Sequence, residues 1–312
     1  MQRSPNQESH GFSRVECQSI VMSDDGQSAA RRGENDRRHG HDAADLTYRL
    51  VAVDLDGTLL TREKRVSPRT RRALAALTAR GCYVVVATGR PFDVLRIFCA
   101  DIALTVPQIT FNGAVIHDPT AGRDLYRQLV PPTYVRPTIG FFIEAGVPSA
   151  LYTTDGLYLD QHMPNPADWT PPPLPPATYL DDMRQAAGHP SIMVVGQADP
   201  ETIARLRPRA VAAFGRDLYV TQTAANLLEF LHPDVSKGSA LRRVAALLGV
   251  GREEIIAFGD SHNDLTMFAY AGLAVAMRNA TPEVRAGADL VTESNEEDGV
   301  AAALERLGLV EA

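Results

Sequence analysis

The chain has 312 residues, of which 45% are hydrophobic, and a formal net charge of −7 at pH 7. This length allows two compact domains, and the negative charge argues against nucleic acid as the main partner. No segment has the ~18 consecutive apolar residues of a membrane-spanning helix, and the N-terminus lacks the apolar region of a secretion signal. The three cysteines show no metal-ligand spacing and favour a reducing compartment, so we expect a cytoplasmic protein.

Residues 1–47 form a polar segment of mixed charge without an apolar period, as in SDDGQSAARRGENDRRHGHDAAD. This composition predicts a disordered tail. A translation start at Met22 would remove only residues of this segment. We therefore expect the fold to begin near Tyr48.

Strands alternate with helices in residues 48–132. Buried strands are predicted for RLVAVD, CYVVVATG and PQITFNG, with helices at SPRTRRALAALTARG and RPFDVLRIFCADIA. In the first helix Ser67 is the expected N-cap, Pro68 the first helical residue and Gly81 the end. Apolar strands that alternate with helices are typical of a parallel sheet covered on both faces.

The middle of the chain has a different pattern. Hairpins are predicted at AVIHDPTAGRDLYRQLV and at SALYTTDGLYLD, where Asp155 and Gly156 form the turn. YVRPTIGFFIEAG predicts a helix despite its proline, and a second helix begins at Asp199 and Pro200. QHMPNPADWTPPPLPP predicts a proline-rich loop, and SIMVVGQ, DLYVTQT and LLEFLH predict strands. Residues 133–230 thus read as a small α+β domain.

The alternation of strands and helices returns in residues 231–312. The segments are SALRRVAALLGV, EIIAFGD, NDLTMFAYAG, LAVAM, TPEVRAGA, DLVT and EEDGVAAALERL. We predict an α/β fold with a doubly wound, Rossmann-like parallel sheet built from residues 48–132 and 231–312. The α+β domain at 133–230 is then a cap inserted between the two halves.

Polar residues follow four of the predicted strands, where ligands bind in a doubly wound sheet. They are Asp54 and Asp56; Thr88, Gly89 and Arg90; Asn112 and Gly113; and Asp260, Asn263 and Asp264. Turn capping would explain one aspartate after the first strand, but it explains two poorly. Helix capping is an equal alternative for Asp260 alone, and Arg90 could be a solvated surface charge.

Clustered carboxylates repel one another unless a cation neutralises them. Oxygen ligands beside a phosphate site favour Mg²⁺. Lys237 lies in the first turn of a predicted helix, where the helix dipole disfavours a cation. A lysine at that position is explained if it binds phosphate together with the helix terminus.

Four segments, DLDGTL, ATGR, SKGSAL and GDSHNDLTMF, resemble the four ordered motifs of the haloacid dehalogenase superfamily of phosphatases. The insertion before SKGSAL resembles the C2-type cap of the Cof-type branch, and the resemblance covers about residues 48–312. It implies that Asp54 attacks phosphorus and that Asp56 is the general acid and base. Mg²⁺ would be bound by Asp54, by the backbone carbonyl of Asp56 and by Asp260, with Asp264 in support. Thr88, Gly89, Lys237 and Asn263 would hold the phosphoryl oxygens, with Arg90, Asn112 and Gly113 as further substrate contacts.

The resulting hypothesis is a Mg²⁺-dependent phosphatase that acts on small phosphorylated metabolites, such as sugar phosphates or pyridoxal phosphate. A phosphotransferase or phosphomutase is the first alternative, and transfer to an acceptor instead of water would distinguish it. A non-catalytic sensor of phospho-ligands is a third reading, but it predicts loss of Asp54 or Asp56, and both are present.

Overall fold

The structure, a computed structural model, describes residues 47–163 and 177–311. Almost all of the predicted tail and most of the predicted proline-rich loop lie outside these residues. Among the residues described, no helix is long and apolar enough to cross a membrane.

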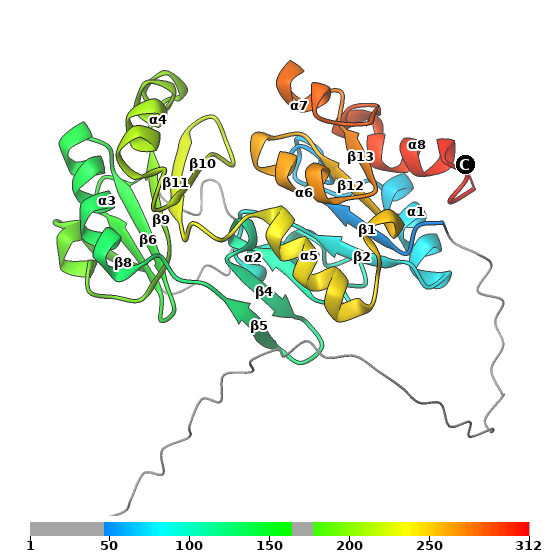
Figure 1. Cartoon of the computed structure of the whole chain (residues 1–312), viewed down its shortest axis with the longest axis horizontal. Coiled ribbons are helices and arrows are strands. Elements are labelled where there is room, and N and C mark those ends of the chain that lie inside the picture. The colour runs from blue at the N-terminus through cyan, green and yellow to red at the C-terminus, as the bar shows by residue number, and fades with distance from the viewer. Residues whose placement is uncertain (1–46, 164–176, 312) are drawn as a thin grey trace, which may run out of the picture. The chain divides into compact units, whose positions relative to one another are not determined.

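The predicted parallel sheet is present, with the strand order β14-β13-β12-β1-β2 (Figure 1). Its strands are β1 (Leu50–Val53), β2 (Tyr83–Val86), β12 (Ile255–Gly259), β13 (Leu273–Ala276) and β14 (Leu290–Val291). Val53 pairs with Val86 on one side and with Phe258 on the other. The carboxyl ends of β1, β2 and β12 therefore lie at the same level of the sheet. This register brings together the residues that follow the three strands.

Both faces of this sheet are covered by helices. They are α1 (Pro68–Ala79), α2 (Phe92–Phe98), α5 (Lys237–Leu248), α6 (Leu265–Tyr270), α7 (Pro282–Ala286) and α8 (Gly299–Arg306). Val51 and Val53 belong to the apolar cluster that includes residues of α1 and α8. Leu50 and Ala52 belong to a second cluster with residues of α5 and α6. Because alternate side chains enter opposite clusters, β1 is apolar at every position.

The ends of α1 match the prediction. The Ser67 hydroxyl accepts a hydrogen bond from the Thr70 backbone N–H, and Pro68 opens the helix. Gly81 follows the helix with a φ of +86°, a conformation that glycine adopts without strain.

The third predicted strand is only partly in the parallel sheet, which corrects the sequence prediction. β3 (Gln108–Thr110), β4 (Val115–Asp118) and β5 (Arg123–Arg127) form a separate antiparallel sheet. One parallel bridge, between Ala87 and Ile109, joins β3 to the end of β2. Earlier along β2, the backbone bonds to the Gln108 side chain instead of to a neighbouring strand. Oε1 of Gln108 accepts from the Val86 N–H at 2.8 Å, and its Nε2 donates to the Val84 carbonyl.

The cap is a six-stranded sheet with the order β10-β11-β9-β6-β7-β8. Its strands are β6 (Ser149–Thr153), β7 (Leu157–Asp160), β8 (Ala177–Leu180), β9 (Ser191–Gln197), β10 (Tyr219–Thr221) and β11 (Leu227–Leu231). Helices α3 (Pro132–Ala145) and α4 (Pro200–Phe214) pack on one of its faces (Figure 1). β8 and the short 3-10 helix Met183–Ala186 were not predicted, because four residues are too few for a clear period. Further 3-10 turns lie at Phe111–Gly113, Arg252–Glu254, His262–Asp264 and Asn295–Glu297.

Candidate active site

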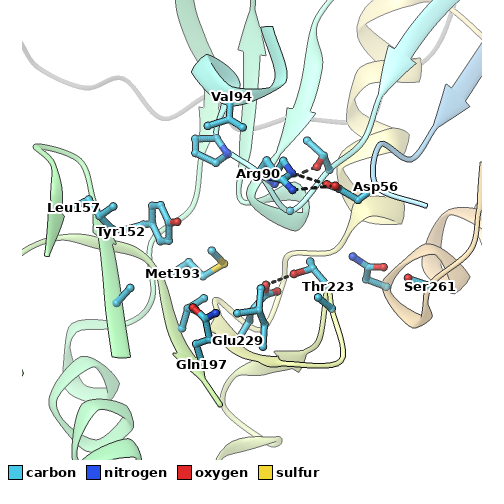
Figure 2. Close-up of a pocket in the computed structure, with 18 of the residues that line it drawn as sticks. Asp56, Arg90, Val94, Tyr152, Leu157, Met193, Gln197, Thr223, Glu229 and Ser261 are labelled. Atoms are coloured by element: carbon cyan, nitrogen blue, oxygen red, sulfur yellow. Dashed lines mark hydrogen bonds and ion pairs between the residues drawn. The ribbon is translucent and has the colours of Figure 1, made fainter. Parts of the chain in front are cut away.

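A pocket of about 200 Å³ lies at the carboxyl ends of β1, β2 and β12 (Figure 2). The sheet contributes Asp54, Asp56 and the Thr88–Arg90 loop to its lining, together with Ser261 and Asn263. The cap contributes residues of β6, β7, β9 and β11. We call the residues at the strand ends, with Asp54 and Asp56 among them, the acidic floor of the site. We call the lining residues of β6, β7, β9 and β11 the cap wall.

Lys237 is a fully buried cation behind this floor. Its Nζ lies 2.5 Å from Oδ1 of Asp54 and 2.6 Å from Oδ1 of Asp264. Burial alone would lower the pKa of Lys237, but the charges of Asp264 and Asp54 outweigh burial and raise it. Ser236 caps the helix by accepting from the Ser239 N–H, which fixes Lys237 in the first turn of α5 as predicted.

Three carboxylates, Asp54, Asp260 and Asp264, offer oxygen atoms that lie within 4.8 Å of one another. Burial raises the pKa of Asp54 well above its usual value, against the lowering effect of Lys237, and the charges of Asp264 and Asp260 raise it further. Burial and then the charge of Asp264 raise the pKa of Asp260 to about 6. Two buried carboxylates and the half-buried Asp260 share one nearby lysine, so the cluster lacks positive charge and this donor set fits a divalent cation.

The three carboxylates are not equivalent. Both oxygens of Asp264 are already engaged, since Oδ1 meets Lys237 and Oδ2 accepts the N–H groups of Asp260 and Ser261 at 3.0 and 2.9 Å. Asp260 accepts from the Thr58 hydroxyl at 2.7 Å through Oδ1. These contacts fit a cation that Asp260 binds directly and that Asp264 supports through its neighbours.

Gly57 explains the glycine of DLDGTL. Its φ is +82°, and a Cβ atom there would lie 2.5 Å from Oδ2 of Asp260. Only glycine therefore lets the turn after β1 approach the Asp260 carboxylate.

Asp56 faces different partners from Asp54. Arg90 donates to it through Nε at 2.5 Å and Nη2 at 2.9 Å, and the Lys64 ammonium donates at 2.6 Å (Figure 2 shows the Arg90 contacts). Burial raises the pKa of Asp56, but the hydrogen bonds and charges of Arg90 and Lys64 outweigh burial and lower it. The Asp56 carboxylate does not belong to the three-carboxylate cluster. The metal contact predicted for Asp56 was its backbone carbonyl, which is compatible with a carboxylate that is engaged by Arg90 and Lys64.

The amides predicted to bind phosphate form a hydrogen-bonded chain. Asn263 Nδ2 donates to Asn112 Oδ1 at 2.9 Å, and Asn112 Nδ2 donates to Glu229 Oε2 at 2.7 Å. Asn263 lines the pocket and its Oδ1 is buried without a partner among the described residues. Asn112 is fully buried and does not line the pocket itself, so it acts on the pocket through its two partners, Asn263 and Glu229.

Gly113 has a packing position rather than a contact with the pocket. A Cβ atom on Gly113 would lie 2.2 Å from the Ser236 carbonyl oxygen, and its φ is +97°. The glycine therefore lets the turn after β3 approach the start of α5. Thr88 and Gly89 do line the pocket, and the Thr88 hydroxyl accepts from the Arg90 N–H at 3.1 Å.

Glu229 is a buried acidic residue of the site that the sequence interpretation missed. It accepts from the Thr223 hydroxyl and from Asn112, and burial raises its pKa to about 7 although both hydrogen bonds lower it. The sequence does contain a signal for Glu229, because it is a single charged residue inside the apolar strand LLEFLH. Lys64, Tyr152 and Gln197 were also missed, because only the tertiary fold brings them to the pocket.

The profile of the haloacid dehalogenase-like hydrolases matches residues 51–304. The chain is 32% identical over 258 residues to 5-amino-6-(5-phospho-D-ribitylamino)uracil phosphatase YitU of Bacillus subtilis, covering 81% of this chain and 94% of that protein. It is 30% identical over 242 residues to the HMP-PP phosphatase of Cronobacter sakazakii, covering 76% and 87%. A solved haloacid dehalogenase-like hydrolase from B. subtilis superposes with a TM-score of 0.73 at 27% identity, covering 84% of this chain and 100% of the other.

The chain therefore belongs to the haloacid dehalogenase-like hydrolases, as the four motifs indicated, and to their Cof-type branch. It is a phosphoric monoester hydrolase.

Proposed function

We propose that this protein is a Mg²⁺-dependent phosphatase of small phosphorylated metabolites that works through an aspartyl-phosphate at Asp54. One observation carries the proposal: the buried Lys237 ammonium contacts Asp54 beside two further carboxylates at the strand ends. Such an arrangement orients one carboxylate oxygen and neutralises charge, which is most of what phosphoryl transfer requires.

In the first step, Asp54 attacks phosphorus, the bond from phosphorus to the ester oxygen breaks, and the leaving oxygen takes a proton from Asp56. In the second step, Asp56 takes a proton from water while that water attacks the aspartyl-phosphate, which releases phosphate and restores Asp54. Thr88, Gly89, Lys237 and Asn263 would hold the transferring oxygens. Phosphate binding by Asn263 needs its Nδ2, which now donates to Asn112, so the amide must rotate or share this donor.

Asp56 must carry a proton to act as an acid, yet its contacts with Arg90 and Lys64 lower its pKa. We infer that substrate phosphate competes with Asp56 for Arg90. Loss of this pairing would raise the pKa of Asp56 at the moment when the leaving oxygen needs a proton. Arg90 would then pair with Asp56 before substrate binds and with the substrate phosphate afterwards.

Asp54, Asp260 and the Asp56 carbonyl would hold Mg²⁺, with Asp264 supporting them through Lys237 and the Asp260 N–H. When bound, the ion would supply charge neutralisation for the phosphoryl oxygens. The raised pKa values of Asp54 and Asp260 support this assignment, because a cation would favour their ionised forms.

Residues 133–230 would form the cap that selects the leaving group, since the cap wall faces the acidic floor across the pocket. Sugar phosphates and pyridoxal phosphate were the substrate types expected from the sequence. Two relatives are named for a phosphoribitylamino-uracil and for HMP-PP, which supports a small phosphorylated metabolite.

The test is phosphate release from a panel of phosphorylated metabolites, measured with Mg²⁺, with excess EDTA, and with Mg²⁺ restored. We expect release only when Mg²⁺ is present, with phosphate going to water rather than to an added sugar acceptor. Full activity in excess chelator would refute the metal assignment, and acceptor-dependent transfer would favour the phosphotransferase alternative.

A further inference from the structure

The cap wall has a regular pattern that bears on the leaving group. The helices α3 and α4 cover one face of the cap sheet, and the other face lines the pocket. Alternate residues point to this open face: Met193, Val195 and Gln197 on β9, Ala150 and Tyr152 on β6, and Leu227 and Glu229 on β11.

The strand register arranges these residues in rows. Glu229, Val195 and Ala150 lie side by side on neighbouring strands. Met193, Tyr152 and Leu157 form the next row, and Gln197 pairs with Leu227 on the other side. The centre of the wall is therefore apolar. Gln197 and Glu229 are diagonal neighbours at one end, and the Tyr152 hydroxyl adds a polar group in the row of Met193 (Figure 2).

The middle of the cap wall is also flat. Val195 and Ala150 are short, and both are buried, so they present a smooth surface rather than a set of projecting polar groups. Tyr152 is braced at one end by an edge contact with Phe111, whose ring centroid lies 5.4 Å away. Such a wall suits the face of a flat ring.

A polyhydroxylated ring fits this wall badly. Hydroxyl groups project all around a hexose, and each one buried without a hydrogen-bond partner lowers affinity by roughly tenfold or more. Ala150, Val195, Met193 and Leu157 have no polar side-chain group to offer, apart from the weakly accepting sulfur of Met193. The pocket is smaller than the ~300–1,000 Å³ typical of sites for drug-sized ligands, which favours a single small ring.

The polar end of the wall has unused hydrogen-bonding capacity. Gln197 lines the pocket, and its Oε1 is buried without a hydrogen-bond partner among the described residues. A primary amide both accepts and donates, so it can pair with a ring edge that carries a donor next to an acceptor. Glu229 holds Thr223 and Asn112 with its two oxygens, and each oxygen keeps a further lone pair toward a donor.

We propose that the leaving group carries a small, flat heteroaromatic ring, whose face packs on the wall of Ala150, Val195 and Met193 and whose donor–acceptor edge meets Gln197. This inference rests on the proposed phosphatase function and narrows its substrate class from phosphate esters in general to those of heteroaromatic alcohols. The phosphate group would then reach the acidic floor at Asp54.

The test compares three phosphate esters of similar size on the full chain with Mg²⁺. They are an aminopyrimidinylmethyl phosphate, benzyl phosphate, which has the ring without the polar edge, and glucose 6-phosphate. We expect kcat/KM to fall about tenfold from the first ester to the second and about a hundredfold from the first to the third. Equal or higher kcat/KM for glucose 6-phosphate would overturn the inference.

Gln197→Leu tests the polar edge. The tenfold preference for the aminopyrimidine ester over benzyl phosphate should shrink to about onefold, mainly through KM. Gln185→Leu is the matched control, because Gln185 is exposed on a 3-10 helix of the cap, and it should keep the preference. An equal loss on both esters in Gln197→Leu would show that Gln197 only supports the fold.

A binding measurement separates this inference from the proposed function. Calorimetric titration of Asp54→Asn with the three esters needs no turnover, and we expect the aminopyrimidine ester to bind at least tenfold more tightly than glucose 6-phosphate. Acetyl phosphate, which has no ring, reports the chemistry of the floor alone. Ring-selective binding without hydrolysis of any ester would refute the proposed phosphatase function and support the proposed ring site. Hydrolysis of the esters without ring selectivity would support the phosphatase function and refute the ring site.

Discussion

The acidic residues around the pocket differ in chemical state because their neighbours differ. Asp54 is buried and Asp260 is half-buried, both lie beside other carboxylates, and the pKa values of both are raised. Asp56 lies only two residues from Asp54 but contacts Arg90 and Lys64, and its pKa is lowered. Two aspartates of one short motif can therefore take different parts in catalysis.

Asp54→Asn should abolish turnover and leave the fold intact. An amide of nearly the same volume cannot attack phosphorus, whereas Lys237 keeps Asp264 as a charge partner. Phosphate release per enzyme should fall by at least a thousandfold, and the melting temperature should stay within a few degrees. If the purified variant kept a tenth of the activity, another residue would have to be the nucleophile.

Glu229→Gln should change how stability depends on pH. Burial raises the pKa of Glu229 from 4.5 to about 7, so the folded protein holds a proton there that the unfolded chain releases. The stability linked to this proton is complete below pH 4.5 and is lost as pH rises through 7, by roughly 3 kcal/mol at most. A glutamine can still accept from Asn112 and donate to the Thr223 hydroxyl, so the variant should fold.

The measurement is the unfolding free energy of both proteins at pH 5 and pH 8. Relative to wild type, Glu229→Gln should gain stability as pH rises. Glu305→Gln is the control, because the ion pair with Arg69 lowers the pKa of Glu305 and places its titration below this range. A wild-type-minus-variant difference that does not change between the two pH values would mean that Glu229 is ionised throughout.

The position of Lys237 depends on close packing at the start of α5. Gly238 donates its N–H to the Thr266 hydroxyl at 3.0 Å, and a Cβ atom on Gly238 would lie 2.0 Å from the Thr266 carbonyl oxygen. The helix can therefore approach the residues that follow Asp264 only without a side chain at this point.

Gly238→Ala should lower the unfolding free energy by about 1–3 kcal/mol, because the clash involves backbone that cannot rotate away. It should also lower kcat by moving Lys237. Gly140→Ala is the matched control, since a Cβ atom on Gly140 in α3 meets nothing within 4 Å. That change should raise stability by about 0.4–1 kcal/mol. Equal melting temperatures for both variants would contradict the packing argument.

Two distant stretches of chain, residues 48–132 and 231–312, build the edge of the sheet that carries the candidate active site. β1 and β2 come from the first stretch and β12 from the last, and Lys237 reaches Asp54 across 183 positions of sequence. The cap lies between these stretches in the chain, so its sheet can vary without a change in the acidic floor.

Removal of residues 1–43 should leave activity and stability unchanged. This segment has no periodic apolar face that could offset the ~1–2 kcal/mol per residue cost of ordering, and none of the site residues lies in it. The comparison is kcat/KM and melting temperature for the full chain and for a protein that starts at Ala44. A fall of several degrees, or a tenfold loss of activity, would mean that the segment docks on the rest of the protein.

Most of the helices and strands, and the gathering of acidic residues at one edge of the sheet, could be predicted from the sequence. Apolar runs of strand length, caps such as Ser67 and breakers such as Gly81 are local signals, and the ends of parallel strands meet at one edge of a sheet. For this reason Asp54, Thr88 and Asp260 can be grouped into one site by sequence alone, and Lys237 is added by its place at a helix start and by the resemblance of SKGSAL to a family motif.

The partners of those residues could not be predicted, because they depend on how distant parts of the chain pack together. The pairing of Asp56 with Arg90 and Lys64, and the chain from Asn263 through Asn112 to Glu229, depend on side-chain contacts that leave no period in the sequence. The separation of β3 from the sheet depends in the same way on the Gln108 side chain. The cap wall depends on which strands pair, because register sets which side chains share a face, and pairing is a long-range property of the fold.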